Sequence, residues 1–277
     1  MPDVSVAICT WNRAKLLDQT LAEMRKLRLS ANLKWELLVV NNNSTDETDE
    51  VINRYSKFLP IRPLFEPNAG QSNARNCAVQ AATGDLMLWT DDDVLVDANW
   101  MVEYLKAARQ WPDAAFFGGT IEPWFAVEPP NWIRRNLHHL EHPFAIRRLG
   151  SDTRSFSPNE YPYGANMAFR TRILKDYPFN PKLGLVQNDT IRGDEFNVIE
   201  RLIKHGYKGV WVGSARVLHY IVPERLTRTY IWDYYRGYGK SEIRQCAQKD
   251  WKLFMGMPRW LWKQYWLARL KSGWFAP

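Results

Sequence analysis

Short apolar runs alternate with segments of helical periodicity through the first half of the chain. Each run is rich in β-branched residues and stops at polar residues, so each predicts a buried strand. The predicted strands are VSVAIC (4–9), WELLVVN (35–41), IRPLFE (61–66) and DLMLWTD (85–91). The intervening segments, with apolar residues three or four positions apart or capping residues at their start, predict helices over 14–27, from about 44, over 70–82 and over 97–109.

Two of these helices are expected to begin with residues that commonly cap a helix. Ser44 or Thr45 is the predicted N-cap of the second helix, because acidic residues follow in its first turn. Asp97 is the predicted cap of the fourth helix, which runs to Arg109.

Strands that alternate with helices predict crossover connections and a mostly parallel sheet in an α/β fold. In such sheets, ligands bind beyond the carboxyl ends of the strands. Three of the predicted strands end in polar residues that should converge on one edge of the sheet, Thr10–Arg13, Asn41–Asn43 and Asp91–Asp93. The sequence therefore predicts a binding site at this edge.

The second half of the chain is less regular. Its patterns predict strands over 116–125 and 163–170, a helix from Asp194 to Gly206, and one or two short strands over 209–220. Residues 122–162 contain many Pro, Trp, Arg and His residues without a clear period, and they predict a long loop region.

The composition indicates a globular protein with a mild basic excess. Of the 277 residues, 45% are hydrophobic and 24% are charged, which allows a sizeable core and argues against global disorder. The formal net charge of +7 suits nucleotide phosphates, anionic lipid or nucleic acid, and does not choose among them. The three cysteines, Cys9, Cys77 and Cys246, are far apart and predict reduced thiols in a cytoplasmic protein. We see no signal peptide and no stretch of about 18 uncharged apolar residues.

The most unusual local feature is a run of three carboxylates, Asp91, Asp92 and Asp93, directly after a predicted strand. Carboxylates this close repel one another, and burial beside a strand increases the cost. Hard oxygen ligands suit Mg²⁺ or Mn²⁺, and a divalent cation would offset the repulsion. The alternative is an Asx turn with solvated carboxylates. The sequence has neither a Gly-rich dinucleotide fingerprint nor a Walker-type phosphate loop, which disfavours the common cofactor folds.

Several motifs occur in an order that resembles the family 2 glycosyltransferases with a GT-A fold. They are VSVAICTWNR, ELLVVNNNSTDET, NAGQSNARNCAVQAATGD, LWTDDDV, YGANMAFR, FNPKLG, RGDEFNVIERLIKHGY and VLHY. The resemblance implies an α/β fold of GT-A type, which is a Rossmann-like nucleotide-binding domain with a mostly parallel central sheet. We expect this domain to span 1–245, with a nucleotide-binding half (1–115) and an acceptor-binding half (116–245), followed by a helical tail over 246–277.

The resemblance also implies a donor-binding set that comprises Thr10, Trp11, Asn12, Arg13, Asn42, Arg75, Asp91, Asp92 and Asn166. Arg75 would face the base or the diphosphate, and its alternative is a solvated position on its helix. The alternative for Trp11 is simple core packing. Asn42 stands where the family commonly has an acidic residue that accepts a hydrogen bond from the uracil N3–H. Because an amide both accepts and donates, UDP-sugars are favoured while GDP- and dTDP-sugars stay open.

Asp91 and Asp93 would be the outer acids of the family's DxD motif, with Asp92 between them and the register uncertain by one residue. One acid touches the ribose, and another holds the Mn²⁺ or Mg²⁺ that bridges the two phosphates. The metal neutralises charge on the departing diphosphate, which lowers the barrier to breaking the sugar–phosphate bond. His219 matches a histidine that supports the metal or the diphosphate in several relatives, and its alternative is a strand-end histidine with ordinary partners. The expected metal set is therefore Asp93, Asp91 and His219.

Inverting transfer also needs a base that deprotonates the acceptor hydroxyl. Asp194 and Glu195 resemble the acidic pair that the family usually places at a helix start, where the helix dipole helps to keep a carboxylate ionised. The family order is more often Glu then Asp, so Glu195 takes the place of the usual base and is one methylene longer. The alternative for Asp194 is that it only caps the helix.

Two further features carry less specific predictions. His138 and His142 lie one helical turn apart and could mimic a metal site, but nothing else supports zinc, so a loop near the acceptor is preferred. The last 27 residues contain five Trp, and the chain from Lys249 onward has six basic residues and one acidic residue. Such a tail either lies in the interface of an anionic membrane or packs on the catalytic domain with its Trp residues buried.

We therefore predict a metal-dependent inverting glycosyltransferase that uses a nucleotide-diphosphate sugar. Its acceptor would be a glycan or lipid-linked intermediate of cell-envelope or polysaccharide biosynthesis, and no nucleic-acid partner is expected. The expected location is the cytoplasm, with peripheral attachment at the inner face of the cytoplasmic membrane as an option. A sugar nucleotidyltransferase is disfavoured because no Gly-rich phosphate loop lies near the N-terminus. A non-catalytic glycan-binding or scaffold protein is disfavoured because the Asp triplet and the Glu195 region are both retained.

Overall fold

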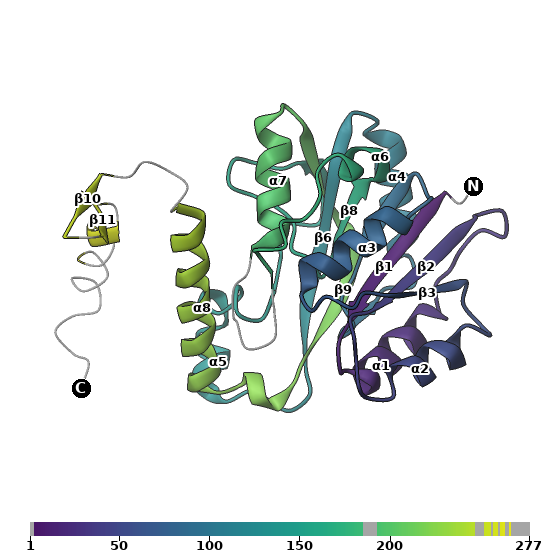
Figure 1. Ribbon diagram of the computed structural model, residues 1–277, viewed down its shortest axis with the longest axis horizontal. Helices are drawn as coiled ribbons and strands as arrows, with labels where there is room; N and C mark the ends of the chain where they lie inside the picture. Colours follow the sequence, from purple (N-terminus) through teal and green to yellow (C-terminus); the bar gives the residue numbers. More distant parts are fainter. Residues whose placement is uncertain are drawn as a thin grey trace.

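A mixed β-sheet forms the centre of the molecule (Figure 1). The computed structural model describes residues 3–184, 193–246, 252–255, 257–259, 261–263 and 266. The strands stand in the order β3-β2-β1-β4-β8-β6-β9-β5, and β7 pairs with β9. They are β1 (Val4–Thr10), β2 (Trp35–Asn41), β3 (Ile61–Phe65), β4 (Leu86–Trp89), β5 (Val94–Val96), β6 (Ala114–Phe125), β7 (Thr153–Ser155), β8 (Met167–Arg170) and β9 (Lys208–Ile221). Strands β1 to β4 are mutually parallel, whereas β8 runs antiparallel to both β4 and β6.

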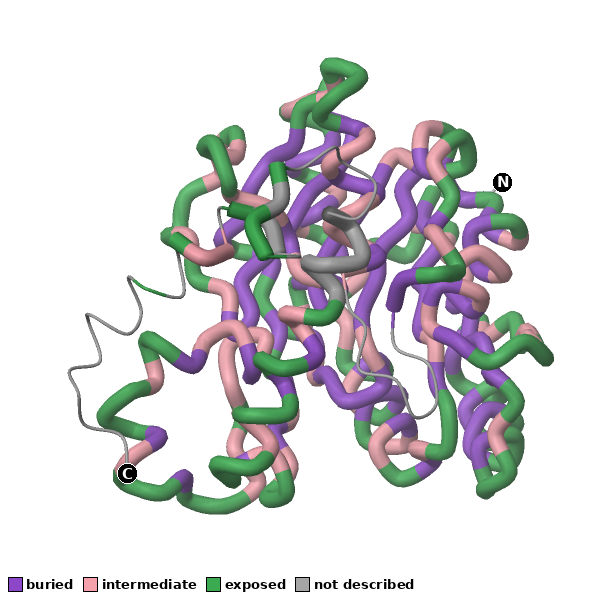
Figure 2. Tube along the Cα trace, turned by 60° about the vertical axis from the view of Figure 1, so that its left-hand side comes forward, coloured by how far each residue is buried: buried purple, intermediate pink, exposed green. Residues whose placement is uncertain are grey.

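Helices cover both faces of the sheet, so the fold has three layers. Successive residues of a strand point to opposite faces, and a strand buried on both faces reads as a continuous apolar run. In β2, Leu37 and Val39 pack in one core with the helices over 14–24, 48–55 and 100–110, whereas Leu38 and Val40 pack in a second core with the helices over 71–81, 171–175 and 194–204. Buried residues accordingly run through the central strands (Figure 2). The helices are α1 (Ala14–Met24), α2 (Thr48–Tyr55), α3 (Gln71–Ala81), α4 (Trp100–Gln110), α5 (Asn131–Arg135), α6 (Thr171–Lys175), α7 (Asp194–Lys204) and α8 (Arg228–Cys246), with short 3₁₀ turns η1 (Leu137–His139) and η2 (Pro223–Arg225).

A bulge in β9 determines where the acidic triplet lies. The β6–β9 ladder shifts register after Gly119, where a Cβ atom would come within 2.1 Å of the Ala215 carbonyl oxygen. Beyond the bulge, β9 also pairs with β5, and Val94 stands opposite His219. Since β5 follows the triplet directly, the chain from Thr90 to Asp93 crosses from the middle of the sheet to the end of β9.

The structure confirms the predicted strands and helices of the first half, but both N-cap predictions are wrong. Helix α2 begins at Thr48, because the hydroxyl of Ser44 accepts the N–H of Asn12 and the N–H of Thr45 donates to the Asn12 side chain. Helix α4 begins at Trp100 with Asn99 as its N-cap, and the Asp97 carboxylate accepts the Asn99 N–H instead.

The second half departs further from the sequence-based expectations. The one or two short strands expected over 209–220 are one long bent strand, β9. The predicted loop region contains α5, η1 and β7, and helix α8 has no counterpart among the predicted elements. In the tail, β10 (Leu253–Phe254) pairs antiparallel with β11 (Met257–Pro258) before helical residues at 259, 261–263 and 266. Of the five tail Trp residues, Trp251, Trp260 and Trp274 lie outside the described residues.

Candidate active site

A cavity of about 620 Å³ opens where the carboxyl ends of the parallel strands meet β9, α7 and α8. It is lined by most of the residues that the sequence singled out, namely Thr10, Trp11, Arg13, Asn42, Arg75, Asp91, Asp92, Asp93, Asp194, Glu195 and His219. Residues far apart in the sequence are thus brought to one place at the predicted edge of the sheet.

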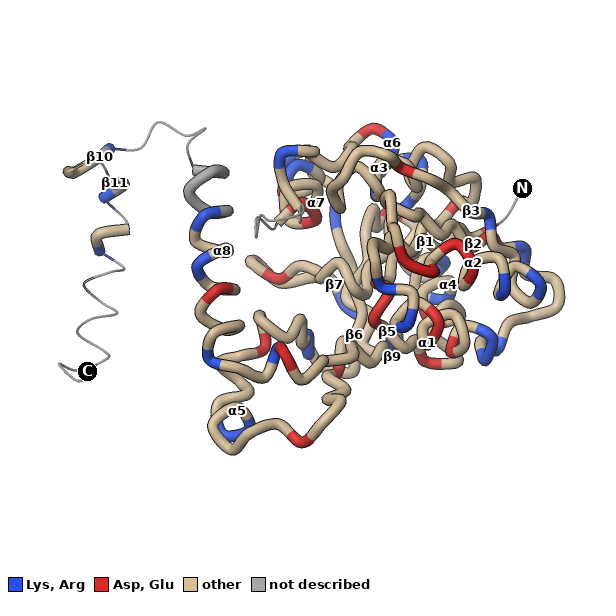
Figure 3. Tube along the Cα trace, turned by 60° about the horizontal axis from the view of Figure 1, so that its bottom comes forward, with Lys and Arg blue, Asp and Glu red and all other residues tan. Residues whose placement is uncertain are grey.

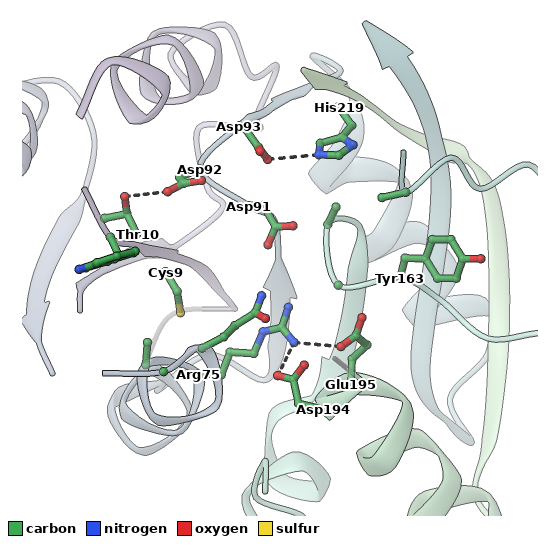
Figure 4. A pocket seen from close by; sticks show the side chains of 18 of the residues that line it. Cys9, Thr10, Arg75, Asp91, Asp92, Asp93, Tyr163, Asp194, Glu195 and His219 are labelled. Atoms are coloured by element: carbon green, nitrogen blue, oxygen red, sulfur yellow. Dashed lines mark hydrogen bonds and ion pairs between the residues drawn. The ribbon is translucent and has the colours of Figure 1, made fainter. Parts of the chain in front are cut away.

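The three carboxylates of the triplet point in three directions (Figure 4). Asp92 accepts hydrogen bonds from the Thr10 hydroxyl at 2.8 Å and from Arg13 Nη1 at 2.8 Å. Asp93 accepts from Arg13 Nη1 at 3.0 Å and from Arg225 Nη2 at 3.3 Å. Asp91 lines the cavity and has no hydrogen bond or ion pair within the part of the chain that the structure describes.

These contacts show what compensates the triplet. Asp92 and Asp93 are buried, so the alternative of a turn with solvated carboxylates is wrong. Burial raises the pKa of Asp92 to about 6 although Arg13 opposes the shift. Burial also works against ionised Asp93, but the surrounding His219, Arg13 and Arg225 hold the pKa of Asp93 well below its usual range. The pKa of Asp91 is raised by burial and by the Asp93 charge, with Arg75 acting against the shift.

His219 presents its Nε2 atom to Asp93. Its Nδ1 lies 2.7 Å from the carbonyl oxygen of Phe144, which can only accept, so Nδ1 carries the proton. Arg225 Nη1 donates to Nε2 at 3.1 Å, and Nε2 is 3.5 Å from Asp93 Oδ1. A histidine with one ring nitrogen bonded to a backbone carbonyl and the other facing a carboxylate has the arrangement of a metal-ligating histidine.

A second charged group faces the triplet across the cavity. Arg75, on α3, is only 3% exposed and donates to Asp194 Oδ2 at 2.7 Å, with Glu195 Oε2 at 3.4 Å (Figure 4). A buried guanidinium needs such partners, so the alternative of a solvated Arg75 is wrong. The two acids differ in accessibility, because the Asp194 side chain is 1% exposed and that of Glu195 is 24% exposed.

The start of α7 places this acidic pair. Gly193 precedes the helix with φ 97°, a left-handed conformation that glycine adopts without strain, and Asp194 and Glu195 occupy the first turn. Burial and the neighbouring Glu195 carboxylate raise the pKa of Asp194 to about 7, although Arg75 opposes the shift. Burial also disfavours ionised Glu195, but Arg75 and Asp194 outweigh it and lower the pKa of Glu195 to about 2. Glu195 is therefore the accessible, ionised member of the pair at neutral pH.

The raised pKa of Asp194 should make the stability of the free protein depend on pH. Between pH 8 and pH 5 the folded state takes up a proton at Asp194, which the unfolded chain binds only near its ordinary pKa of 3.8. The free energy of unfolding should therefore increase as the pH falls, by on the order of 2 kcal/mol from this group. Denaturant unfolding of wild type and Asp194→Asn at both pH values measures it. The increase in the free energy of unfolding from pH 8 to pH 5 should be smaller in Asp194→Asn than in wild type. An equal increase in both proteins would show that Asp194 is not its source.

Asn42 lines the cavity, but its side-chain amide is already engaged. The NH₂ group donates to the carbonyl oxygens of Glu66 and Asn68, and the amide oxygen accepts the Gly70 N–H at 2.9 Å. Asn42 thus fixes the loop that enters α3. Trp11 is 41% exposed and lines the cavity, so the alternative of simple core packing is wrong for Trp11.

The structure does not bring Asn12 or Asn166 to the cavity. Asn12 ties the end of β1 to Ser44 and Thr45. Asn166 is fully buried, donates to the carbonyl oxygens of Thr120 and Ala215, and accepts from Trp100 Nε1 and the Tyr104 hydroxyl. Neither side chain lines the cavity, so their place in the donor-binding set stays a prediction. Asn166 instead joins α4, β6 and β9 at the bulge.

Replacing Asn166 with Ala should reduce the free energy of unfolding by about 3 to 5 kcal/mol. The substitution leaves the Trp100 N–H and two buried carbonyl oxygens without the Asn166 amide, whereas the Tyr104 hydroxyl keeps its bond to the Asn166 backbone carbonyl, and each loss is costly in a dry interior. Chemical denaturation measures the change. Asn32→Ala, at an exposed position, is the control and should stay within about 0.5 kcal/mol of wild type.

Sequence reasoning missed one charged residue and, apart from His142, an aromatic wall of the cavity. Arg225 carries no local pattern that marks it. The wall residues are His142, Tyr161, Tyr163, Phe196, Tyr230, Tyr234 and Tyr238. The last three follow one another at four-residue intervals on α8, which is a recognisable stripe. His142 lines the cavity, and it lies on the loop that the sequence analysis placed near the acceptor in preference to a zinc site. Its Nδ1 is 2.5 Å from the Tyr234 hydroxyl, and this contact does not support a zinc site.

Comparisons with known proteins give a consistent result. The family model described as "Glycosyl transferase family 2" matches residues 5–177. The succinoglycan biosynthesis protein ExoM of Rhizobium meliloti is 25% identical over 138 residues, which is 49% of this chain and 44% of that protein. The glucosyl-dolichyl phosphate glucuronosyltransferase of Haloferax volcanii is 22% identical over 247 residues, which is 86% of this chain and 76% of that protein. The chain therefore spans less than half of the first relative.

Solved structures share the fold. S. aureus TarS (residues 1–349) in complex with UDP-GlcNAc has a TM-score of 0.61 at 16% sequence identity, covering 91% of this chain and 68% of that one. The mannosyltransferase PcManGT from Pyrobaculum calidifontis, in complex with GDP-Man and Mn²⁺, has a TM-score of 0.58 at 19% identity, covering 88% and 64%. The predicted GT-A type α/β fold is confirmed.

Proposed function

The chain belongs to glycosyl transferase family 2, and from that premise we propose that it is an inverting, metal-dependent glycosyltransferase. It would move a sugar from a nucleotide-diphosphate donor to an acceptor hydroxyl. The observation that carries the proposal is one cavity in which the Asp91–Asp93 triplet faces the Arg75–Asp194–Glu195 group. The first group suits a diphosphate with its cation, and the second supplies a base.

The donor lies on the side of the cavity built by the first 93 residues. The exposed ring of Trp11 offers a surface for the nucleotide, and Arg13 offers positive charge near the phosphates. Asp91 and Asp92 are the candidate ribose contacts. UDP-sugars remain the proposed donors, with GDP- and dTDP-sugars open. The Asn42 amide is held by the loop before α3, so base selection falls to other groups.

The carboxylates of the Asp91–Asp93 triplet, on the donor side of the cavity, fit a divalent cation, Mn²⁺ or Mg²⁺. Asp91 offers a cavity-lining carboxylate without a partner among the described residues, and Asp93 and His219 line the same cavity. No three His, Cys, Asp or Glu side chains converge on one point in the described ranges. Such cations are commonly held by one or two carboxylates together with substrate phosphates, so the protein need supply only part of the shell. When bound, the cation neutralises charge on the departing diphosphate.

Glu195 is the proposed base. Its carboxylate is ionised and accessible, and Arg75 fixes its position. It would accept the proton of the acceptor hydroxyl while that oxygen attacks the sugar carbon opposite the departing phosphate, which inverts the configuration. Asp194, buried against Arg75, would hold the guanidinium in place.

The acceptor would occupy the aromatic side of the cavity. Tyr230, Tyr234 and Tyr238 line the cavity together with Tyr163 and Phe196, and aromatic rings suit the ring of a sugar acceptor. A glycan or lipid-linked acceptor of cell-envelope or polysaccharide biosynthesis is therefore proposed. The relative from Haloferax volcanii, by its name, acts on a glucosyl-dolichyl phosphate.

The division into a donor half (1–115) and an acceptor half (116–245), followed by a tail (246–277), is proposed with this function. No helix in the described part of the chain is long and apolar enough to cross a bilayer. Basic residues recur along α8 (Figure 3), and Arg228, Arg236 and Lys240 among them are exposed. Together with the basic, Trp-rich tail they support peripheral attachment of a cytoplasmic enzyme to an anionic membrane surface.

A thermal-shift screen tests the donor class. UDP, GDP and dTDP are each added with Mn²⁺ and with excess chelator. A ligand that binds only the folded state stabilises it by mass action, by about 2.7 kcal/mol at one hundred times its dissociation constant. We expect one of the three to raise the melting temperature, and to do so only with Mn²⁺. Absence of any shift with all three would contradict the proposal.

A further inference from the structure

We propose that Arg225 occupies the position of the divalent cation in the free protein and moves to the donor's diphosphate when a cation binds. Arg225 would then be a substrate-binding residue whose availability depends on the cation. The inference rests on the proposed function, because it assumes a nucleotide-diphosphate donor in the cavity. It adds a residue that neither the sequence motifs nor the comparisons identify.

One guanidinium engages both of the side chains that a cation would use. Arg225 Nη1 donates to the Nε2 of His219 at 3.1 Å, and Nη2 donates to Asp93 Oδ2 at 3.3 Å. Nε2 and the Asp93 carboxylate are 3.5 Å apart, so the guanidinium bridges them. A guanidinium is positive at all accessible pH values and has no lone pair for a metal. Arg225 and a cation therefore exclude each other from these two groups.

The released side chain would remain beside the donor. Arg225 is 19% exposed, lines the same cavity as Asp91, and ends the short turn η2 between β9 and α8. The most anionic part of a bound donor is its diphosphate, and the planar fork of an arginine matches phosphate oxygens bidentately. Arg13 Nη1 is shared between Asp92 at 2.8 Å and Asp93 Oδ2 at 3.0 Å, so it can keep Asp92 when Asp93 turns to a cation.

The exchange predicts two effects of opposite sign for Arg225→Ala. Mn²⁺ alone should bind about threefold to tenfold more tightly, because a partly exposed ion pair that competes for Asp93 is removed. Nucleoside diphosphates at saturating Mn²⁺ should bind about tenfold more weakly or worse, because a charged hydrogen-bond donor to the phosphates is lost. A residue that only supports the fold would weaken both.

The experiment is calorimetric titration of the full chain with Mn²⁺ alone, and then with UDP, GDP and dTDP and the matching monophosphates at saturating Mn²⁺. Arg225→Ala and Arg225→Gln are compared with wild type, and thermal unfolding confirms that each variant is folded. If Arg225→Ala does not fold, the binding data for Arg225→Gln decide the test. Arg228→Ala is the matched control, because Arg228 lies three residues after Arg225 at the start of α8, is exposed, stacks over Trp132 at 5.7 Å and does not line the cavity. It should bind both ligands as wild type does.

Tighter Mn²⁺ binding together with weaker diphosphate binding, and with monophosphate binding little changed, is the expected result. Mn²⁺ affinity that is unchanged or reduced in the Arg225 variants would overturn the exchange. Equal losses for mono- and diphosphates would overturn the diphosphate contact. A wild-type chain that binds no nucleoside diphosphate would instead contradict the proposed function, and this inference would fall with it.

Discussion

Replacing Glu195 with Gln should lower the rate of sugar transfer by about 10²-fold to 10⁴-fold, which is the usual contribution of a positioned general base. Gln keeps the shape of the side chain and can still accept a hydrogen bond from Arg75, but it cannot take up the proton of the acceptor. The affinity for the donor should stay within about twofold, since Glu195 lies on the other side of the cavity from the triplet. Turnover and donor binding are measured on the same preparation.

Asp194→Asn is the companion variant for this prediction. Asp194 is buried against Arg75 and contributes by holding that guanidinium, so its loss should be milder than that of Glu195. A Glu195→Gln enzyme that turned over normally while Asp194→Asn was inactive would exchange the two roles. If both variants kept full activity, the base would have to be sought elsewhere in the cavity.

Replacing Asp91 with Asn should weaken Mn²⁺-dependent binding of the nucleoside diphosphate by at least about tenfold, because a hard oxygen ligand is lost. The same change should raise the melting temperature of the free protein at pH 7 to 8. Burial and the Asp93 charge raise the pKa of Asp91 in the folded state, so the ionised side chain is held at a cost that the neutral amide avoids. Loss of function with a gain of stability is typical of a residue retained for binding.

Asp93→Asn tests whether the gain in stability is specific to Asp91 or follows the loss of any carboxylate of the triplet. Asp93 is paired with Arg13, Arg225 and His219, so its replacement should weaken cation-dependent binding and also lower the melting temperature. Differential scanning calorimetry of the two variants without ligand measures the contrast. Destabilisation by both substitutions would show that the Asp91 carboxylate is compensated in the free protein after all.

The nucleotide-binding half of the fold could be predicted because its determinants are local. Strands β1, β2 and β4 are buried on both faces, so their sequences are continuous apolar runs, and each ends at polar residues. Parallel strands carry those ends to one edge of the sheet, which is why Thr10, Arg13 and the triplet meet in the cavity. Helix starts are less well determined, because Ser44 and Thr45 have the right chemistry for a cap and are used by Asn12 instead.

The rest of the site depends on contacts between distant residues that no local pattern contains. The triplet is compensated by Arg13 and by Arg225, which lie 80 and 132 positions from Asp93 in the chain. Asn166 was placed among the donor-binding residues through its motif, and only the packing of α4 against β9 shows that its amide is enclosed. The tyrosine stripe of α8 was present in the sequence, but without the fold nothing indicated that this face lines the cavity.

The most direct test of the proposed transferase is whether the purified chain splits a nucleotide sugar. UDP-, GDP- and dTDP-sugars are incubated without acceptor, with Mn²⁺ or with chelator, and released nucleoside diphosphate is quantified. We predict slow release from one donor class, dependent on the cation and strongly reduced in Asp91→Asn. No release from any of them, with no binding of the corresponding diphosphates in the thermal-shift screen, would contradict the assignment of this cavity as a glycosyltransferase active site.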